Sequence, residues 1–310
     1  MQNDFRFAYR SGSFLSLKTC FLPDGEMEEK SMYTERKLLS EDGKYYVDIF
    51  VQHESPEIKL SHLRPMVVVL PGGGYMMTSD REAEPIALEY LAAGFNAAVV
   101  RYHVNKDAVW PNPQVDVSEA LKYIRANAGR FLTDPNKIAL CGFSAGGHLT
   151  ASMGVHWDDP EIQKRSGCLN GENRPDALVL GYAVINDRPL FYNPDSMGAL
   201  LRNYAGTPEY DKMYEYVCCE KYVKKEKTPP AFMFSTWSDH CVPIHNTLDF
   251  AAALDKENIP AEVHIYQNGE HGLGLADFRT YCVPANLSPD AVEWIKLSCN
   301  WLWNLFGRGV

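Results

Sequence analysis

The sequence predicts an α/β protein built on a mostly parallel, doubly wound sheet of about eight strands with flanking helices. Two observations lead to this prediction. Strand-like runs alternate with helical patterns, and from Met66 onward most of these runs are apolar at nearly every position. Strands covered on both faces have continuous apolar runs, and strand–helix alternation is typical of parallel crossovers.

Eight segments have the composition of strands. The first two have turn-rich sequence and no helical pattern between them, so we expect them to form an antiparallel edge. The segments are Phe14–Phe21, Tyr45–Val51, Met66–Leu70, Asn96–Tyr102, Lys137–Cys141, Ala177–Ile185, Pro230–Trp237 and Ala261–Gln267.

Helical patterns lie between the later strands. The first ends before Gly94, a residue favoured just past a helix C-terminus, and the second carries Val117, Leu121 and Ile124 on one face. The predicted helices are Glu82–Ala93, Pro113–Phe131, Asn246–Lys256 and the tryptophan-rich Ser288–Phe306.

One connection is too long for a single crossover helix. The aromatic-rich segment Asp187–Pro229 precedes a strand, and insertions at the carboxyl ends of α/β strands usually cover the functional site. We therefore expect a short lid at about 187–229 within a single domain, 1–310. A packed surface segment without substrate contact is the alternative.

Composition excludes several kinds of partner. The net charge is −10 and no long Lys/Arg-rich stretch occurs, so neither nucleic acid nor an anionic membrane is expected to bind. No apolar run reaches about 18 residues, the length that spans a bilayer. Eight cysteines are scattered along the chain, and the N-terminus has no basic–apolar leader pattern. We expect reduced thiols and a cytoplasmic protein.

The most informative stretch is Gly142-Phe-Ser-Ala-Gly146, which follows the apolar run Lys137–Cys141. A G-x-S-x-G turn between a strand and a helix holds its serine in a strained conformation and exposes the hydroxyl. The glycines leave room where backbones approach closely. The following helix directs free N–H groups toward the same place. Ser144 is therefore a candidate nucleophile.

An activated serine needs a base, and the base needs an orienting acid. In the order Ser, Asp, His, each residue follows a strand. Asp239 comes just after the run that ends at Trp237, and His271 lies in a glycine-framed loop after Gln267. His240 and Glu270 are competing candidates that are one residue out of register.

The segment Leu70-Pro-Gly-Gly-Gly-Tyr75 directly follows another strand. Consecutive glycines let backbone N–H groups approach a ligand, so Gly73, Gly74 and Ala145 are candidate oxyanion donors. A flexible turn or a phosphate loop is the alternative, although neither nucleotide-binding pattern is present.

Tyr75, His103 and Trp110 are candidates for contact with substrate, since they lie in loops after strands. A plain loop role is equally consistent with the sequence, and His148 is more typical of a structural residue. No H-E-x-x-H or spaced C-x-x-C occurs, so we expect no metal and no cofactor.

Four motifs resemble those of α/β-hydrolase esterases related to hormone-sensitive lipase. They are Pro71-Gly-Gly-Gly-Tyr75, Gly142-Phe-Ser-Ala-Gly-Gly-His-Leu149, Asp239-x-x-Val-Pro243 and Glu270-His-Gly-Leu-Gly-Leu275. Within these esterases the sequence is most similar to the acetyl-esterase and acetyl-xylan-esterase-like group, whose members are often labelled xylanases or sugar esterases. The similarity runs from about Met66 to Ala276.

The resemblance implies Ser144 as nucleophile, Asp239 as acid, His271 as base, and Gly73, Gly74 and Ala145 as oxyanion donors. Pro71 stands where the lipase-type H-G-G-G motif has histidine, a departure from the lipase branch. Xylanase chemistry would require a pair of catalytic carboxylates, whereas the strongest constellation here suits acyl transfer.

We therefore expect a cofactor-free serine esterase that acts on short acyl esters, chiefly acetylated sugars or oligosaccharides. The alternatives are a general small-molecule carboxylesterase, a prolyl-oligopeptidase-like peptidase and a non-catalytic binding protein of the same fold. The sequence allows a homo-oligomer and does not decide the oligomeric state.

Overall fold

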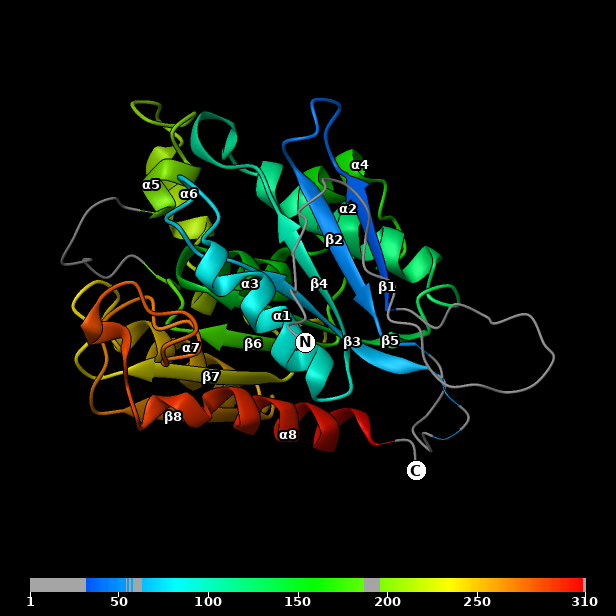
Figure 1. The fold of residues 1–310 in the computed structure, drawn as a ribbon. Helices are drawn as coiled ribbons and strands as arrows, with labels where there is room; N and C mark the ends of the chain where they lie inside the picture. The colour runs from blue at the N-terminus through cyan, green and yellow to red at the C-terminus, as the bar shows by residue number, and fades with distance from the viewer. Residues whose placement is uncertain (1–31, 54, 56, 58–62, 187–195, 309–310) are drawn as a thin grey trace, which may run out of the picture.

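A computed structural model describes residues 32–53, 55, 57, 63–186 and 196–308 (Figure 1). Its centre is an eight-stranded sheet in the order β1-β2-β4-β3-β5-β6-β7-β8. The pairs β1–β2 and β2–β4 are antiparallel and the remaining pairs are parallel. The prediction of a mostly parallel sheet is confirmed. The strands are β1 Tyr33–Leu38, β2 Tyr46–Val51, β3 Arg64–Leu70, β4 Asn96–Arg101, β5 Thr133–Phe143, β6 Ala177–Gly181, β7 Ala231–Thr236 and β8 Ala261–Tyr266.

An antiparallel edge was predicted and is confirmed, but its outer strand β1 was not among the predicted strands. Strand β1 pairs with β2 from Tyr33 opposite Val51 to Leu38 opposite Tyr46. The sequence of β1 is largely charged and nearly all its residues are exposed, so it lacks the apolar pattern by which a strand is recognised. The predicted strand Phe14–Phe21 lies outside the described residues.

Helices cover both faces of the sheet (Figure 1). The longer α-helices are α1 Glu84–Ala92, α2 Asn112–Ala126, α3 Ser144–His156, α7 His245–Lys256 and α8 Trp294–Phe306, and α4 Pro160–Ser166 is a short one. Helix α2 stops before the predicted Phe131, and α8 starts later than the predicted Ser288 because 3₁₀ segments precede it. In both cases turn-forming sequence follows or precedes the periodic part.

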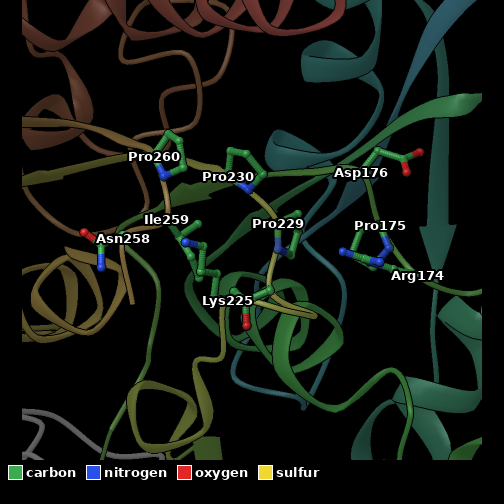
Figure 2. Close-up of a pocket in the computed structure, with 10 residues that line it drawn as sticks. Arg174, Pro175, Asp176, Lys225, Pro229, Pro230, Asn258, Ile259 and Pro260 are labelled. Atoms are coloured by element: carbon green, nitrogen blue, oxygen red, sulfur yellow. The ribbon is translucent and has the colours of Figure 1, made fainter. Parts of the chain in front are cut away.

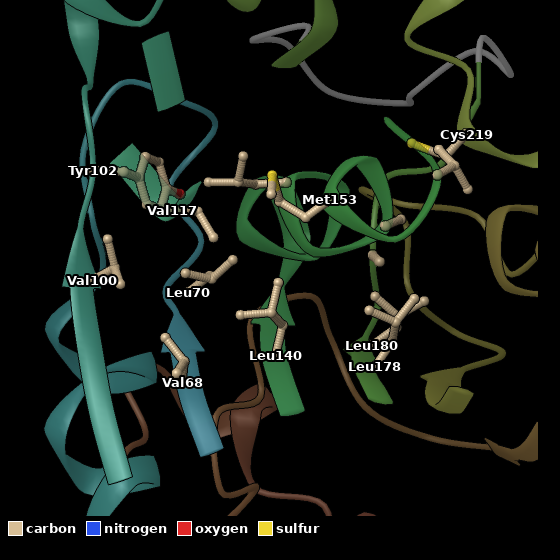
Figure 3. Packing of buried hydrophobic residues seen from close by; sticks show 14 of the residues in the cluster. Val68, Leu70, Val100, Tyr102, Val117, Leu140, Met153, Leu178, Leu180 and Cys219 are labelled. Atoms are coloured by element: carbon tan, nitrogen blue, oxygen red, sulfur yellow. The ribbon is translucent and has the colours of Figure 1, made fainter. Parts of the chain in front are cut away.

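Alternate residues of the strands enter two separate hydrophobic cores, as the pleat requires. On one face Val68 and Leu140 pack with Val117 of α2 and Met153 of α3 (Figure 3). On the other face the neighbouring strand residues pack with α1 and α8, where Trp294 is fully buried. The doubly wound arrangement therefore holds the central strands rigidly from both sides.

The segment expected to form a lid is described from residue 196 onward; residues 187–195 lie outside the described residues. It contains the short helices α5 Ser196–Leu200 and α6 Tyr210–Tyr216. Backbone hydrogen bonds link Trp110 N–H to the carbonyl of Leu200 and Cys219 N–H to that of Ile185. The described tyrosines of this segment, Tyr204, Tyr210, Tyr214, Tyr216 and Tyr222, pack against the core of the α3 face. Its contact with substrate stays a prediction.

Two further findings bear on the sequence predictions. Among the described residues, no helix has both the length and the apolar character needed to cross a membrane. The seven cysteines in that part of the chain form no disulfide with one another.

Candidate active site

Ser144 lies at a sharp junction between β5 and α3. Its φ is +53°, a conformation that costs a non-glycine residue free energy and recurs at functional sites. A Cβ on Gly142 would overlap the carbonyl oxygen of Gly146, and one on Gly146 would overlap the carbonyl oxygen of Leu70. Glycine is therefore required on both sides of the serine, because backbones meet there.

The side chains of Ser144, His271 and Asp239 are joined in one line of hydrogen bonds. His271 Nε2 lies 2.8 Å from Ser144 Oγ, and His271 Nδ1 lies 2.8 Å from Asp239 Oδ2. An ionised carboxylate only accepts, so Nδ1 carries the proton and Nε2 is left to accept one from the serine. The geometry is that of a nucleophile, a base and an orienting acid.

Asp239 is fixed by backbone groups. It is buried, and its Oδ1 accepts from the N–H groups of Cys241 and Val242, each at 2.8 Å. Oδ2 therefore remains for the imidazole. His240 points elsewhere as an exposed residue, and the described hydrogen bond of Glu270 is a backbone bond to Ala285. The two competing candidates are not part of the line.

The glycine loop after β3 is bent back beside Ser144. Gly73 and Gly74 have φ values of +127° and +64°, which glycine adopts without strain. Within the described part of the chain, their N–H groups donate to no protein acceptor. Ala145 lies in the first turn of α3, where an N–H has no acceptor inside the helix. The three predicted donors are thus free to bind an anionic oxygen.

Two of the three residues expected to contact substrate, Tyr75 and Trp110, are buried inside the protein. Tyr75 is fully buried, with its hydroxyl 2.8 Å from His148 Nδ1. Trp110 is buried against His156 and Tyr216. Both side chains are buried among protein groups, and their predicted contact with substrate stays a prediction.

His103 is the third of these residues. Its Nδ1 lies 2.6 Å from Asp116 Oδ2, and its ring stacks on Tyr45. The imidazole is partly exposed. Its predicted role toward substrate stays a prediction.

Sequence reasoning missed other residues near the site. Glu82 and Tyr182 are buried beside the glycine loop and the histidine loop, and only their positions after strands could have suggested them. Trp237 and Phe278 are 69% and 76% exposed, and they belong to the segments that carry Asp239 and His271. Their role toward a ligand belongs to the proposals below.

The protein also has a hollow of about 360 Å³ at the amino ends of β6, β7 and β8 (Figure 2). Asp176, Pro230 and Pro260 line it and directly precede β6, β7 and β8. Ser144, Asp239 and His271 follow the opposite ends of their strands. The hollow is therefore not the reactive site. Within the described residues, no cluster of three or more His, Cys, Asp or Glu could hold a metal ion.

Fold and site together define an α/β hydrolase. The chain belongs to the BD-FAE family, whose model matches residues 48–254.

Two solved structures resemble almost the whole chain. MGS-M1, an α/β hydrolase enzyme from a Medee basin deep-sea metagenome library, is 34% identical with a TM-score of 0.71, covering 89% of this chain and 98% of its own. An acetyl ester-xyloside bifunctional hydrolase from Caldicellulosiruptor lactoaceticus is 30% identical with a TM-score of 0.70, covering 92% of this chain and 99% of its own.

Curated relatives are longer proteins. Endo-1,4-beta-xylanase B of Butyrivibrio fibrisolvens is 36% identical over 69% of this chain. Acetylxylan esterase of Xylanibacter ruminicola is 28% identical over 83% of this chain. The alignments span only 33% and 49% of those proteins. Their names describe chains of which this one matches half or less.

Proposed function

We propose that this protein is a serine esterase that hydrolyses short-chain acyl esters, chiefly acetyl esters, of carbohydrates. The observation that carries the proposal is the line of hydrogen bonds from Ser144 through His271 to Asp239. Such a line suits acyl transfer, because it joins a hydroxyl nucleophile to a base whose tautomer is fixed.

The reaction proceeds in two halves. Ser144 Oγ attacks the ester carbonyl carbon while His271 Nε2 takes its proton, and the carbonyl oxygen becomes negatively charged. The N–H groups of Gly73, Gly74 and Ala145 bind this oxygen, and loss of one such donor commonly costs about 10²–10³ in kcat. The imidazolium then protonates the departing alcohol. Water, deprotonated by His271, attacks the acyl-enzyme and releases the carboxylic acid.

Asp239 holds the imidazole in place during both halves. Its Oδ2 accepts the Nδ1 proton and stabilises the charge that His271 carries while it holds the second proton. The acid is buried and its other oxygen is held by two backbone donors. The imidazole therefore keeps one orientation from the first attack to the second.

A small acyl group suits the surroundings of Ser144. The carbonyl oxygen of Ser144 accepts from Val184 N–H at 3.2 Å, and Ala183 and Val184 are buried beside the elbow. This contact shows that the backbone of Val184 packs directly against the elbow, and we propose that the space on this side of Ser144 suits acetyl better than a long chain.

Carbohydrate as the alcohol part is supported by two observations. One is the names of the relatives, an acetylxylan esterase and an acetyl ester-xyloside hydrolase. The other is the exposure of Trp237 and Phe278, which lie in the segments that carry Asp239 and His271, because aromatic faces are large, rigid surfaces on which apolar sugar faces can pack.

We do not extend the activity of a xylanase to this chain. The matched xylanase lies mostly outside the alignment, and glycoside hydrolysis uses two carboxylates that flank the bond to be broken. Asp239, in contrast, is buried and committed to His271. The proposed reaction is therefore ester hydrolysis alone.

The decisive experiment measures acetate released from acetylated xylo-oligosaccharides by the wild type and by Ser144→Ala, with a nitrophenyl xyloside as the glycoside control. We expect acetate from the wild type only, and no release of nitrophenol from the xyloside. Equal acetate release by Ser144→Ala would reject the nucleophile. Cleavage of a simple acetyl ester without action on acetylated sugars would keep the esterase and reject the carbohydrate.

A further inference from the structure

Glu82 is a buried carboxylate that the proposed reaction does not use. It is only 3% exposed and ends the short 3₁₀ segment Asp80–Glu82, which follows the glycine loop. Its Oε2 accepts from Gly72 N–H at 2.8 Å, and its Oε1 accepts from the Tyr182 hydroxyl at 2.7 Å. Burial of a charged group is costly unless it is hydrogen-bonded, and here both oxygens have a donor.

Tyr182 continues this link to the histidine loop. Its hydroxyl accepts from Gly274 N–H at 2.9 Å, and its ring packs edge-on against the ring of His271 with centroids 5.2 Å apart. Burial raises the pKa of the Tyr182 phenol well above its usual range, so the hydroxyl stays neutral and donates to Glu82. One continuous path thus runs from Gly72 through Glu82 and Tyr182 to Gly274.

Arg81 makes a second connection to the same loop. Its Nη1 donates to the carbonyl oxygens of Gly272 at 2.7 Å and Thr280 at 3.2 Å. Arg81 and Glu82, which follow the glycine loop, are therefore both connected to the loop that carries His271. Arg81 bonds to it directly, and Glu82 is linked to it through Tyr182.

The carboxylate also lies close to the nucleophile. A Cβ built on Gly72 would be 2.6 Å from Glu82 Oε2 and 3.0 Å from the Cβ of Ser144. Glu82, the peptide of Gly72 and Ser144 are therefore immediate neighbours, and there is space for nothing larger than glycine between them.

We propose, on the basis of the esterase function above, that Glu82 and Tyr182 are positioning residues that fix the oxyanion donors relative to His271. The donors and the base act on the same tetrahedral species, and they come from loops almost 200 residues apart in the sequence. Oxyanion stabilisation depends on donors that already point to where the charge forms. The Glu82–Tyr182 contact connects the two loops, so the distance between the donors and His271 does not depend on the substrate.

The test is the pair Glu82→Gln and Tyr182→Phe. A glutamine side chain has one acceptor oxygen and one NH₂ donor, so it cannot offer a separate acceptor oxygen to Gly72 and to Tyr182, as Glu82 does. Phenylalanine keeps the ring against His271 but loses the bonds to Glu82 and Gly274. For each variant we expect kcat on an acetyl ester to fall at least about 10-fold, with KM changed by less than about 2-fold.

The matched control is Tyr90→Phe. Tyr90 is also fully buried, and its hydroxyl lies 2.9 Å from Ser298 Oγ, in the layer of α1 and α8. The Tyr90→Phe variant loses a buried hydroxyl that contacts neither the glycine loop nor the loop that carries His271. We expect this variant to lose as much thermal stability as Tyr182→Phe and to keep the kcat of the wild type. The rate of covalent labelling by a serine-reactive fluorophosphonate should follow kcat across the three variants.

The outcomes separate this proposal from the esterase function. If Ser144→Ala remains fully active, the proposed function fails, whatever Glu82 does. If Ser144→Ala is inactive while both variants keep kcat within about 2-fold of the wild type, the positioning role is overturned and the esterase stands. If either Glu82→Gln or Tyr182→Phe does not fold, the kcat of the other variant decides. A fall in kcat and stability of equal size in Tyr90→Phe would also overturn the proposal.

Discussion

The hydroxyl of Tyr75 lies 2.8 Å from Nδ1 of His148, which joins the glycine loop after β3 to the helix that begins at Ser144. The opposite nitrogen of His148, Nε2, lies 2.8 Å from the carbonyl oxygen of Val217. A carbonyl only accepts, so Nε2 carries the proton and Nδ1 accepts from the tyrosine. One imidazole thus connects the glycine loop, the elbow helix and the inserted segment.

Tyr75→Phe should lower the free energy of unfolding by about 0.5–1.5 kcal/mol, the usual net contribution of an intramolecular hydrogen bond. Tyr75 also has a φ of +59°, so loosening this residue should disturb the adjacent donors and reduce kcat more than it raises KM. Urea unfolding and steady-state kinetics on an acetyl ester measure the two effects. Wild-type stability in the variant would show that the contact contributes nothing.

The second prediction concerns the joint action of the base and the nucleophile. His271→Ala should lose nearly as much activity as Ser144→Ala, because each residue is useless without the other across their 2.8 Å contact. The double variant should therefore be little worse than either single one. Turnover of a nitrophenyl acetate by all three purified variants tests this. Losses that multiply would indicate that another residue acts as the base.

The third prediction is a preference for short acyl chains. It rests on the proposal that the buried segment of Ala183 and Val184, which packs against the backbone of Ser144, restricts the space for the acyl group. We expect kcat/KM to fall from acetyl to octanoyl esters, with discrimination of about 1–3 kcal/mol where a methylene meets a pocket wall. A series of nitrophenyl esters of increasing length measures the trend. A preference for octanoyl would move the protein to the lipases.

The fourth prediction concerns the alcohol side. Trp237→Ala should raise KM for acetylated xylo-oligosaccharides several-fold and leave turnover of a small nitrophenyl acetate unchanged, because only the sugar reaches the exposed ring. Leu169→Ala is the control: Leu169 is also 69% exposed, but it precedes β6 and so lies at the other end of the sheet. An equal effect of both substitutions on the sugar substrate would reject the aromatic surface.

The fifth prediction is a loss of stability in acid. His156 is buried at the end of α3, where its Nε2 donates to the carbonyl of Tyr216, and burial lowers its pKa to about 4. In the unfolded chain the imidazole returns to about 6.5. Between these values the unfolded state binds more protons, so stability falls as the pH drops through that window, by roughly 3 kcal/mol in full.

Substitution of His156 by Gln keeps a donor for Tyr216 and removes the ionisation. The variant should therefore lose less stability than the wild type between about pH 7 and about pH 4.5, measured by urea unfolding at each pH. Identical losses in the two proteins would show that another group is responsible.

The fold could be predicted where residues are buried on both faces, as in β3 to β7, because the central residues of those strands are apolar. Strand β1 could not, because its polar, exposed residues give no periodic signal and it is held mainly by pairing with β2. The contact between Glu82 and Tyr182 joins residues 100 positions apart. No local pattern in a single sequence indicates such a pair.

The sequence indicates Ser144, Asp239 and His271 as candidates because each belongs to a tight turn with a characteristic local composition. The structure brings Ser144, Asp239 and His271 together in the predicted order. Their catalytic roles stay a proposal. Tyr75 was predicted to contact substrate, because it is an aromatic residue directly after the glycine loop. In the structure its ring is fully buried, a property that the local sequence does not indicate.

Strand β8 lies at the edge of the sheet and pairs only with β7, whereas β5 lies in the middle between β3 and β6. Residues of β8 alternate between exposed and half-buried, while those near the end of β5 are buried. His271 and Ser144 therefore depend on regions of unequal local stability. We therefore expect the β8 edge to open first and to move His271 away while the elbow stays intact, so that activity is lost on heating before the amide groups of the central strands become open to exchange.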